Sequence, residues 1–503
     1  MILLAIASCL LGAAIVRLLI PLIVRECARR RILDRPSDLH HAHSRPVPRL
    51  GGLALAGAFV GVELFIALVQ PDDGVSIPAR DAVILGSLAM FGLGLWDDLR
   101  GLGARKKLLG QILIAVGVCT SGIGIQQFQI PLTQHIIPLG HSGLLVTVFW
   151  LVAVTNLINL IDGADGLAAG ICLMLMLLIA YVGHQGGSFE LLAAGMSGAL
   201  LAFLRFNFPP ARIYLGDGGA YFLGFQIGLF SLIDSHKGAV FASLAAPMFV
   251  LALPILDTSL AIARRGLWGL PIFRPDRRHL HHHLQSIGFS RRRVVLSFYA
   301  VTLVFLVMGF VTVWSRGHWI PGLLGFGSLV LLACAGSLGF SREWFAVGRV
   351  VGNSFGMRKE IQYALSLTHW LELEGERCGS LDGLWTSFSF AAHKLGFTSA
   401  KLTSAGGQRA WAHPHGGRPT RSARYELHGG RSGILELEAP DSGPSGPGGE
   451  PAGQGASGGK KLCLGVSDSK AFEILSELLA EGWLKSAARC NGVCAQPENR
   501  AGK

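Results

Sequence analysis

The sequence contains few charged residues. Asp, Glu, Lys and Arg make up only 15% of its 503 residues, whereas hydrophobic residues make up 50%. A soluble globular domain usually carries about 25% charged residues. This shortage argues against a wholly soluble protein, and the mean hydropathy of +0.47 is typical of long apolar segments. We therefore expect a chain that crosses a lipid bilayer several times.

The nine cysteines form no cluster along the chain. A structural zinc site needs four ligands, and Cys490 and Cys494 have no second pair to complete one. We interpret all nine as structural or incidental thiols, and we expect those near the C-terminus to stay reduced in the cytoplasm. The first apolar segment also lacks a basic start and a small-residue cleavage site. It therefore predicts an uncleaved membrane span rather than a signal peptide.

Apolar residues come in blocks that approach the length of a membrane span. About 20 such residues cross roughly 30 Å of hydrocarbon. The sequence predicts about eleven spans: Met1–Val24, Gly51–Val69, Ala82–Leu95, Leu108–Ile125, Gly143–Leu160, Leu167–Val182, Leu191–Leu204, Ala220–Ile233, Val240–Ala263, Val294–Trp314 and Ile320–Phe340. The predicted fold is an all-α polytopic membrane protein over residues 1–340, followed by a second domain over 341–503. Residues 126–141 are expected to form a short hairpin outside the membrane.

Positive charges mark one side of the predicted membrane domain. Lys and Arg gather in the first, third, seventh and ninth loops and are rare in the alternate loops. Because such residues stay in the cytoplasm, we expect the odd-numbered loops and the C-terminal domain inside and the N-terminus outside. The formal net charge of +12 is then mostly a signal of topology. Nucleic-acid binding is not favoured, since no basic stretch is interleaved with aromatic residues.

Residues 341–503 differ in composition, and no further span is predicted there. The elements expected are helices over 358–373, 384–395 and 471–484 and strands over 423–427, 433–439 and 462–466. Residues 441–460 are rich in Gly, Ser and Pro and should form a flexible loop. This pattern predicts a small cytoplasmic α+β domain, whose element order loosely resembles that of GAF-type domains.

Carboxylates at the ends of spans require a reason, because charge near a membrane is costly. Asp97 and Asp98 close the third predicted span, and Lys107 precedes the fourth. Adjacent carboxylates repel each other unless a cation or phosphate chemistry uses them. Asp217 begins the eighth span among glycines that would let backbone amides approach a ligand. A solvated helix end and a helix N-cap are the structural alternatives for these acids.

A polar stripe ends the fifth predicted span. Asn156, Asn159 and Asp162 recur every three positions, which places them roughly on one helix face. Such a stripe cannot face lipid, so it faces a wet cavity or a polar ligand, or it joins helices by polar contacts. Asp165 follows in the next turn, and Asn207 stands in the motif that contains Asp217.

Two basic segments complement the acids. Four histidines stand within His279–His283, close to three arginines. This cluster could bind Zn²⁺, but no separate cluster of cysteine or acidic partners suits a hydrolytic zinc site, so we favour binding of phosphate or pyrophosphate. A proline-stiffened loop that contains Arg49 is either another phosphate-binding element or simply a positive-inside loop. Carboxylates beside phosphate-binding residues predict Mg²⁺, which uses one or two protein oxygens plus substrate phosphates.

The sequence resembles the polyprenyl-phosphate N-acetylhexosamine-1-phosphate transferases of glycosyltransferase family 4. The resemblance covers roughly residues 1–340 and rests on five motifs in family order: HSRPVPRLGG, GLWDDLRGLGARKKLLGQ, NLINLIDGADGLAAG, FNFPPARIYLGDGGA and RPDRRHLHHHL. The PDRRHLHH form of the last motif is closer to the branch that makes lipid-linked GlcNAc than to the branch that uses UDP-MurNAc-pentapeptide. His283 departs from that motif, which would have a basic residue there.

The resemblance implies transfer of an N-acetylhexosamine 1-phosphate, GlcNAc being favoured, from a UDP-sugar to undecaprenyl phosphate in a bacterial inner membrane. UMP would leave, and a cell-envelope polysaccharide would be initiated. Asn159 and Asp217 would hold Mg²⁺, with Mn²⁺ as a substitute, and Asp97 and Asp98 would act at the acceptor phosphate as catalytic residues. The implied substrate-binding residues are Asp162, Asp165, Lys107, Arg49, Asn207, His279, His281 and His282.

Two other functions are compatible with the composition, namely a secondary transporter and a membrane-anchored sensor that works through its C-terminal domain. A transporter would place polar residues near the membrane midplane rather than at span ends. A sensor would not need the acidic and histidine motifs. The sequence does not determine which sugar is used, which polymer is made or whether the chain forms a homodimer. It also leaves two mechanisms open, namely direct attack and a two-step route through a covalent aspartyl intermediate.

Overall fold

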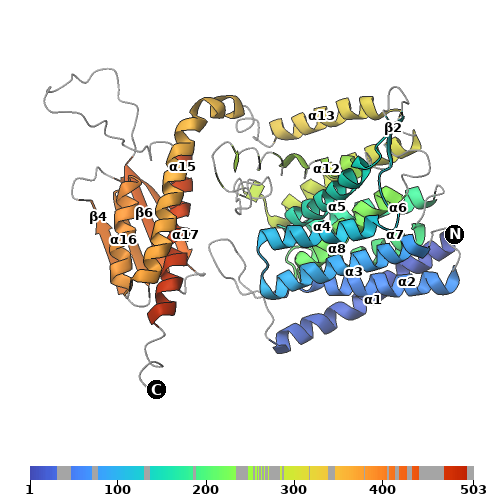
Figure 1. Cartoon of the computed structure of the whole chain (residues 1–503), viewed down its shortest axis with the longest axis horizontal. Helices are drawn as coiled ribbons and strands as arrows, with labels where there is room; N and C mark the ends of the chain where they lie inside the picture. Colours follow the sequence, from blue (N-terminus) through green and yellow to red (C-terminus); the bar gives the residue numbers. More distant parts are fainter. Residues whose placement is uncertain are drawn as a thin grey trace. The chain divides into compact units, whose positions relative to one another are not determined.

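The structure is a computed structural model that describes residues 1–30, 47–70, 77–129, 136–184, 189–233, 247–252, 255–257, 259, 262, 265–266, 270, 284–285, 288–315, 318–337, 346–378, 380–404, 407–413, 419–427, 433–440 and 469–494. This part of the chain is mostly helical, with small antiparallel sheets. It divides into two compact units. The first contains α1–α8, α12 and α13, and the second contains α15–α17 and β3–β6 (Figure 1).

The helices of the first unit follow the apolar blocks of the sequence. They are α1 (Ile2–Arg30), α2 (Gly51–Val69), α3 (Ile77–Arg100), α4 (Ala104–Cys119), α5 (Ser142–Ile161), α6 (Leu167–His184), α7 (Glu190–Asn207), α8 (Gly216–Ile233), α12 (Arg291–Trp314) and α13 (Ile320–Ser337). Each predicted span coincides with one of them except Val240–Ala263, which lies largely outside the described residues. Within the described residues, 6 helices are long and apolar enough to cross a membrane, namely α1, α2, α3, α5, α6 and α12. The total of eleven spans stays a prediction.

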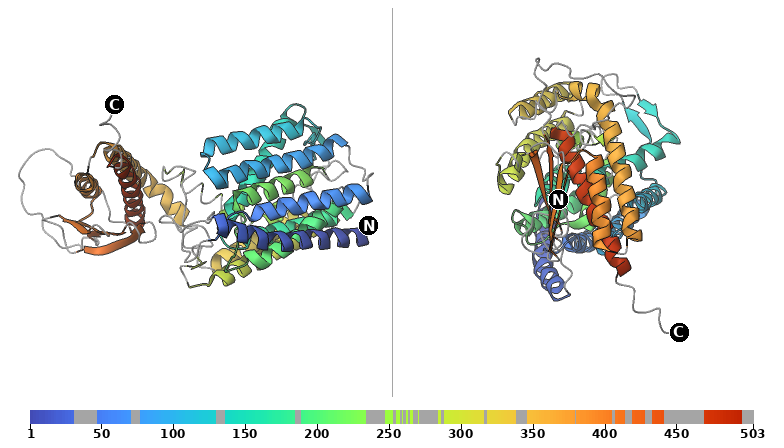
Figure 2. Two further views of the ribbon diagram at one scale, coloured as in Figure 1. Left: turned by 90° about the horizontal axis from the view of Figure 1, so that it is seen from below. Right: turned by 90° about the vertical axis from the view of Figure 1, so that its left-hand side faces the viewer.

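Helix α8 is the centre of the first unit. Every residue from Gly218 to Leu232 is buried, and α2, α3, α5 and α6 pack around it. A side chain on Gly224 would lie 2.7 Å from Thr155 Cα, so α5 and α8 approach each other backbone to backbone. Figure 2 shows the helices of this unit side by side with their axes roughly aligned. Large apolar side chains such as Leu3 and Leu10 of α1 remain exposed, as a face turned to lipid requires.

A short hairpin connects α4 to α5. Strand β1 (Gln127–Gln129) pairs antiparallel with β2 (Ile136–Pro138), with Phe128 opposite Ile137. The strand pairing predicted within residues 126–141 is therefore confirmed, while its place outside the membrane stays a prediction.

The second unit is a sheet covered by helices. Its elements are α15 (Ala346–Arg377), α16 (Leu381–Lys394), β3 (Ser399–Ser404), β4 (Gly407–Ala412), β5 (Pro419–Leu427), β6 (Gly433–Pro440) and α17 (Ser469–Cys494). The strands are antiparallel in the order β4-β3-β6-β5. Alternate residues of β6 are buried, and the rings of Trp385, Phe388 and Trp483 pack together between α16 and α17.

This second unit confirms the predicted α+β character and the antiparallel pairing of the strands around 423–427 and 433–439. Strands β3 and β4 were not predicted. The strand predicted over 462–466 and the loop predicted over 441–460 lie outside the described residues. The likeness to GAF-type domains stays a prediction.

Candidate active site

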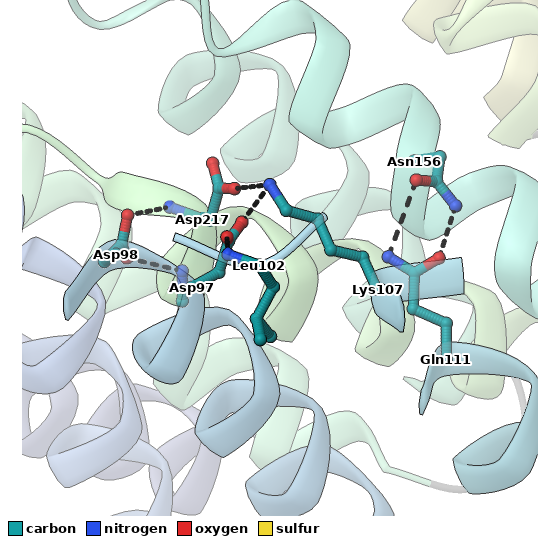
Figure 3. Close-up of polar contacts among 8 residues, drawn as sticks. Asp97, Asp98, Leu102, Lys107, Gln111, Asn156 and Asp217 are labelled. Atoms are coloured by element: carbon teal, nitrogen blue, oxygen red, sulfur yellow. Dashed lines mark hydrogen bonds and ion pairs between the residues drawn. The ribbon is translucent and has the colours of Figure 1, made fainter. Parts of the chain in front are cut away.

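Three helix ends bring ionisable side chains together at one end of the first unit. Asp97 lies in the last turn of α3, Lys107 in the first turn of α4 and Asp217 in the first turn of α8 (Figure 3). Lys107 Nζ forms an ion pair with Asp97 Oδ2 and lies 3.2 Å from Asp217 Oδ2. One ammonium group is therefore shared by carboxylates from two helices. We call Asp97, Lys107 and Asp217 the charged centre.

The members of the charged centre differ in their access to solvent. The Asp97 side chain is only 4% exposed, and its Oδ1 accepts a hydrogen bond from the Leu102 backbone N–H at 2.6 Å. The side chains of Asp217 and Lys107 are 32% and 27% exposed. A buried carboxylate is stable only when it is paired and hydrogen-bonded. Asp97 is therefore placed to hold Lys107, whereas Asp217 and Lys107 can reach a ligand.

Asp98 has different partners from its neighbour Asp97. Its Oδ1 accepts a hydrogen bond from the Asp217 backbone N–H at 3.0 Å, and its Oδ2 accepts one from the Gly218 N–H at 2.9 Å. N–H groups in the first turn of a helix have no partner within that helix. A residue at the end of α3 therefore caps α8, which lies more than a hundred residues further along the chain.

The end of α5 adds polar groups beside the charged centre. Helix α5 packs against α8 in the opposite direction, since Leu151 contacts Gly228 and Thr155 contacts Gly224. Asn159, in the last turn of α5, and Asp162, which follows it, therefore lie beside the first turn of α8. Of the predicted polar stripe, Asp162 lies near the acids of α3 and α8, whereas Asn156 bonds to Gln111 of α4.

Negative charge accumulates around Asp162. Loss of solvation is the largest cause that raises the pKa of Asp162 well above its usual range, and the carboxylates of Asp217 and Asp98 raise it further. The Arg49 guanidinium acts in the opposite direction on Asp162, and it also interacts with Asp98. Arg49 therefore lies near these acids, and its binding of substrate stays a prediction.

Backbone contacts explain how that loop reaches the site. The Tyr214 N–H donates to the Pro48 carbonyl at 2.9 Å, and the Gly51 N–H donates to the Tyr214 carbonyl at 2.9 Å. The start of α2 is thus bound to the segment that leads into α8. The predicted residues His279, His281 and His282 lie outside the described residues, so their placement stays a prediction.

Asp165 and Asn207 bond to backbone groups, and we call this pair the loop anchor. Asn207 Oδ1 accepts a hydrogen bond from the Gly166 N–H at 3.0 Å, and its Nδ2 donates to the Ile213 carbonyl at 2.9 Å. Asp165 Oδ2 accepts one from the Ala211 N–H at 3.1 Å. These bonds fasten the turn after α5 to the segment before α8. They position the site, while direct contact of either residue with substrate stays a prediction.

Sequence reasoning missed two residues that support the site. Gln111 of α4 is buried and accepts a hydrogen bond from Asn156 Nδ2 at 2.6 Å, which ties α4 to α5 (Figure 3). Tyr299 of α12 donates its hydroxyl to the Gly166 carbonyl at 2.6 Å. An amide inside an apolar span, four residues after Lys107, is a signal that indicates Gln111. No local pattern marks Tyr299, since its partner is distant in sequence.

The described residues offer ligands for a hard cation without forming a complete metal cage. Among them, no group of three or more His, Cys, Asp or Glu side chains could hold a metal ion alone. Mg²⁺ does not need such a group, because it keeps water and binds substrate phosphates. The partly exposed Asp217 carboxylate fits that mode of binding, and Asn159 stands in the last turn of the neighbouring helix α5. Such a site can bind and orient a diphosphate.

Comparisons with known proteins find similarity over the part of the chain that contains the charged centre. A family model described as "Glycosyl transferase family 4" matches residues 81–235, which include the charged centre and Asn159. A "Probable undecaprenyl-phosphate N-acetylglucosaminyl 1-phosphate transferase" of Bacillus subtilis strain 168 is 35% identical over 305 residues, 59% of this chain and 83% of that protein.

Two other relatives match a similar length of the chain. A "Decaprenyl-phosphate N-acetylglucosaminephosphotransferase" of Mycobacterium tuberculosis strain H37Rv is 36% identical over 283 residues, 51% of this chain and 70% of that protein. A "Phospho-N-acetylmuramoyl-pentapeptide-transferase" of Desulforudis audaxviator is 31% identical over 318 residues, 58% of this chain and 91% of that protein.

Proposed function

Because the chain belongs to glycosyl transferase family 4, we propose that it transfers N-acetylglucosamine 1-phosphate from UDP-GlcNAc to undecaprenyl phosphate and releases UMP. Two of the relatives are named for a transferase that joins this sugar phosphate to a polyprenyl phosphate. The observation that carries the proposal is the charged centre, in which a partly exposed lysine is shared between carboxylates at helix ends. The relatives give no support to a transporter or a sensor.

Asp217 and Asn159 are the proposed protein ligands of Mg²⁺. When bound there, Mg²⁺ neutralises negative charge on the donor diphosphate and orients it. Lys107 is the residue proposed to change partners. Its ammonium can turn from Asp217 toward a phosphate oxygen while Asp97 retains it. Arg49 and the histidines of the 279–283 motif would supply further donors to the phosphates.

The proposed chemical step is attack by an oxygen of the acceptor phosphate on the sugar-linked phosphorus. A bond forms between these two atoms, and the bond from that phosphorus to the bridging oxygen of the diphosphate breaks. UMP leaves with the bridging oxygen and both electrons of the broken bond. A dianionic acceptor phosphate has no proton to lose, so no general base is required. Asp97 then contributes by placing Lys107 rather than by taking a proton.

We propose that this step takes place at the cytoplasmic face of a bacterial inner membrane, where positive charge collects around Arg100, Arg105 and Lys106. Single-cysteine variants with cysteine in place of Arg105 or His141 test this orientation, because the two exposed positions flank opposite ends of the α4–α5 pair. A membrane-impermeant maleimide added to intact cells should label position 141 and spare position 105. Labelling at position 105 alone would place the site outside and would remove access to cytosolic UDP-sugars.

The function itself is tested in membranes that contain the chain, supplied with radiolabelled UDP-GlcNAc and undecaprenyl phosphate. Membranes with the Asp217→Asn variant provide the background of host transferases. We expect label in the organic-extractable lipid well above that background, and less with UDP-GalNAc or UDP-MurNAc-pentapeptide as donor. If lipid labelling equals the background with every donor, the proposed function is wrong.

A further inference from the structure

The neighbouring acids Asp97 and Asp98 stand in different environments. Asp97 belongs to the charged centre, where it pairs with Lys107. Asp98 uses both carboxylate oxygens to accept backbone N–H groups of α8, at 3.0 Å from Asp217 and 2.9 Å from Gly218. Figure 3 shows that Asp98 bonds to the backbone of the first turn of α8. Lys107 contacts the side-chain carboxylate of Asp217, which belongs to the same turn. The two acids therefore cannot be treated as an equivalent pair.

The ends of α3 and α8 pack closely around the Asp98 carboxylate. A side chain on Gly216 would lie 2.7 Å from Asp98 Oδ2, and one on Gly94 would lie 2.5 Å from the Asp217 carbonyl oxygen. Gly216 also has a φ of 76°, which favours glycine. The sequence suggested that the glycines around Asp217 let amides approach a ligand. In the structure, Gly94 and Gly216 bring the ends of α3 and α8 together, and the Asp98 carboxylate accepts the hydrogen bonds of the amides.

We propose that Asp98 is a positioning residue that fixes the first turn of α8 and thereby sets the Asp217 carboxylate opposite Lys107 and Asp97. An anionic group at a helix N-terminus is favourable because the helix dipole and the unpaired N–H groups attract it. The bond to the Asp217 N–H restrains the very residue whose side chain enters the charged centre. The expected effect of Asp98 on transfer rests on the proposed function, whereas its effect on the first turn of α8 does not.

The test compares Asp98→Asn, Asp98→Ala and Asp97→Asn in the full-length protein. Asparagine at position 98 keeps one acceptor oxygen and therefore one of the two bonds, whereas alanine keeps none. Hydrogen exchange in the peptide that contains residues 214–220 should be fastest in Asp98→Ala, intermediate in Asp98→Asn and unchanged in Asp97→Asn. Unchanged exchange in Asp98→Ala would overturn the proposal. This readout needs no activity, so it separates the proposal from the function.

The kinetic readout distinguishes positioning from proton transfer. We expect transfer by Asp98→Asn to fall by about tenfold, as for loss of one supporting contact, with the pH profile of kcat unchanged in shape. The transfer rate of Asp98→Ala should fall further, and this variant should require more Mg²⁺ for a half-maximal rate. Loss of the acidic limb of the pH profile in Asp98→Asn, with normal exchange, would show that Asp98 acts as a base. If Asp98→Ala fails to fold, Asp98→Asn alone decides both readouts.

Discussion

The charged centre and the loop anchor lie at the same end of the first unit, yet their side chains have different kinds of partner. In the loop anchor, Asn207 and Asp165 bond to backbone groups at 2.9–3.1 Å. In the charged centre, Lys107 bonds to side-chain carboxylates that are themselves charged. A side chain cannot lose its backbone partner unless the loop opens. By contrast, a cation can replace Lys107 as the partner of a carboxylate, and a phosphate can replace a carboxylate as the partner of Lys107. The difference separates residues that shape the site from residues that act in it.

The largest effects are expected in the groups proposed to hold the metal. Asp217→Asn keeps the size of the side chain but removes its charge, and Asn159→Ala removes an oxygen ligand. Each should lower Mg²⁺-dependent transfer by at least about 10²-fold, as loss of a preorganised electrostatic group does. The assay is lipid labelling from UDP-GlcNAc with purified protein that elutes as a single folded species.

A matched control is available in the second unit. Asp382 is 83% exposed and pairs with Arg409 at 2.7 Å, so Asp382→Asn removes a similar charge from a solvated surface pair. Its transfer rate should equal that of the unchanged protein. Normal turnover in a well-folded Asp217→Asn or Asn159→Ala variant would remove the metal assignment.

Substitutions in the loop anchor should lower the stability of the protein more than its transfer activity. Asn207→Ala leaves the Gly166 N–H and the Ile213 carbonyl without their partner, and each buried unpaired group costs about 1–3 kcal/mol. The unfolding midpoint in detergent should therefore drop, and activity measured well below that midpoint should fall less than in Asp217→Asn. Asn207→Asp, which keeps the acceptor and loses the donor, should be intermediate. An unchanged midpoint with abolished transfer would instead place Asn207 in direct contact with substrate.

The smallest effect is expected from removal of the second unit. Its acids Glu372 and Glu376 are occupied by ion pairs with Arg489 at 3.3 Å and 2.7 Å, and the five motifs all precede residue 341. Truncation after residue 340 should leave basal transfer and alter regulation or assembly instead. UMP release by truncated and full-length protein in detergent measures this. A stable, monodisperse truncated form without activity would mean that the second unit takes part in the active site.

The sequence could predict what depends on local patterns. Apolar blocks predicted the helices of the first unit, and acids at span ends indicated one shared site, in which the structure brings Asp97, Asp98 and Asp217 together. Partners that are distant in sequence could not be predicted. Asp98 looks identical to Asp97 in the motif, and only the packing of α8 against α3 separates them.

The same limit explains the other omissions. The bond from Tyr299 to Gly166 joins segments 133 residues apart, and no pattern near either residue indicates it. Strands β3 and β4 are short, and β4 is exposed or half-buried along its length, so the alternation of apolar residues that indicated β6 is weak there. This edge strand is held in the sheet by its pairing with β3 rather than by burial of its side chains.

The most direct test of the account is the identity of the nucleotide that the purified full-length protein releases from UDP-GlcNAc in the presence of undecaprenyl phosphate. Transfer of the sugar phosphate predicts UMP in an amount equal to the lipid-linked product, and none after Mg²⁺ is removed with a chelator. Release of UDP would mean that the sugar alone is transferred, and UMP formation that persists with the chelator would contradict the proposed metal site. Chromatography of the reaction mixture distinguishes these results.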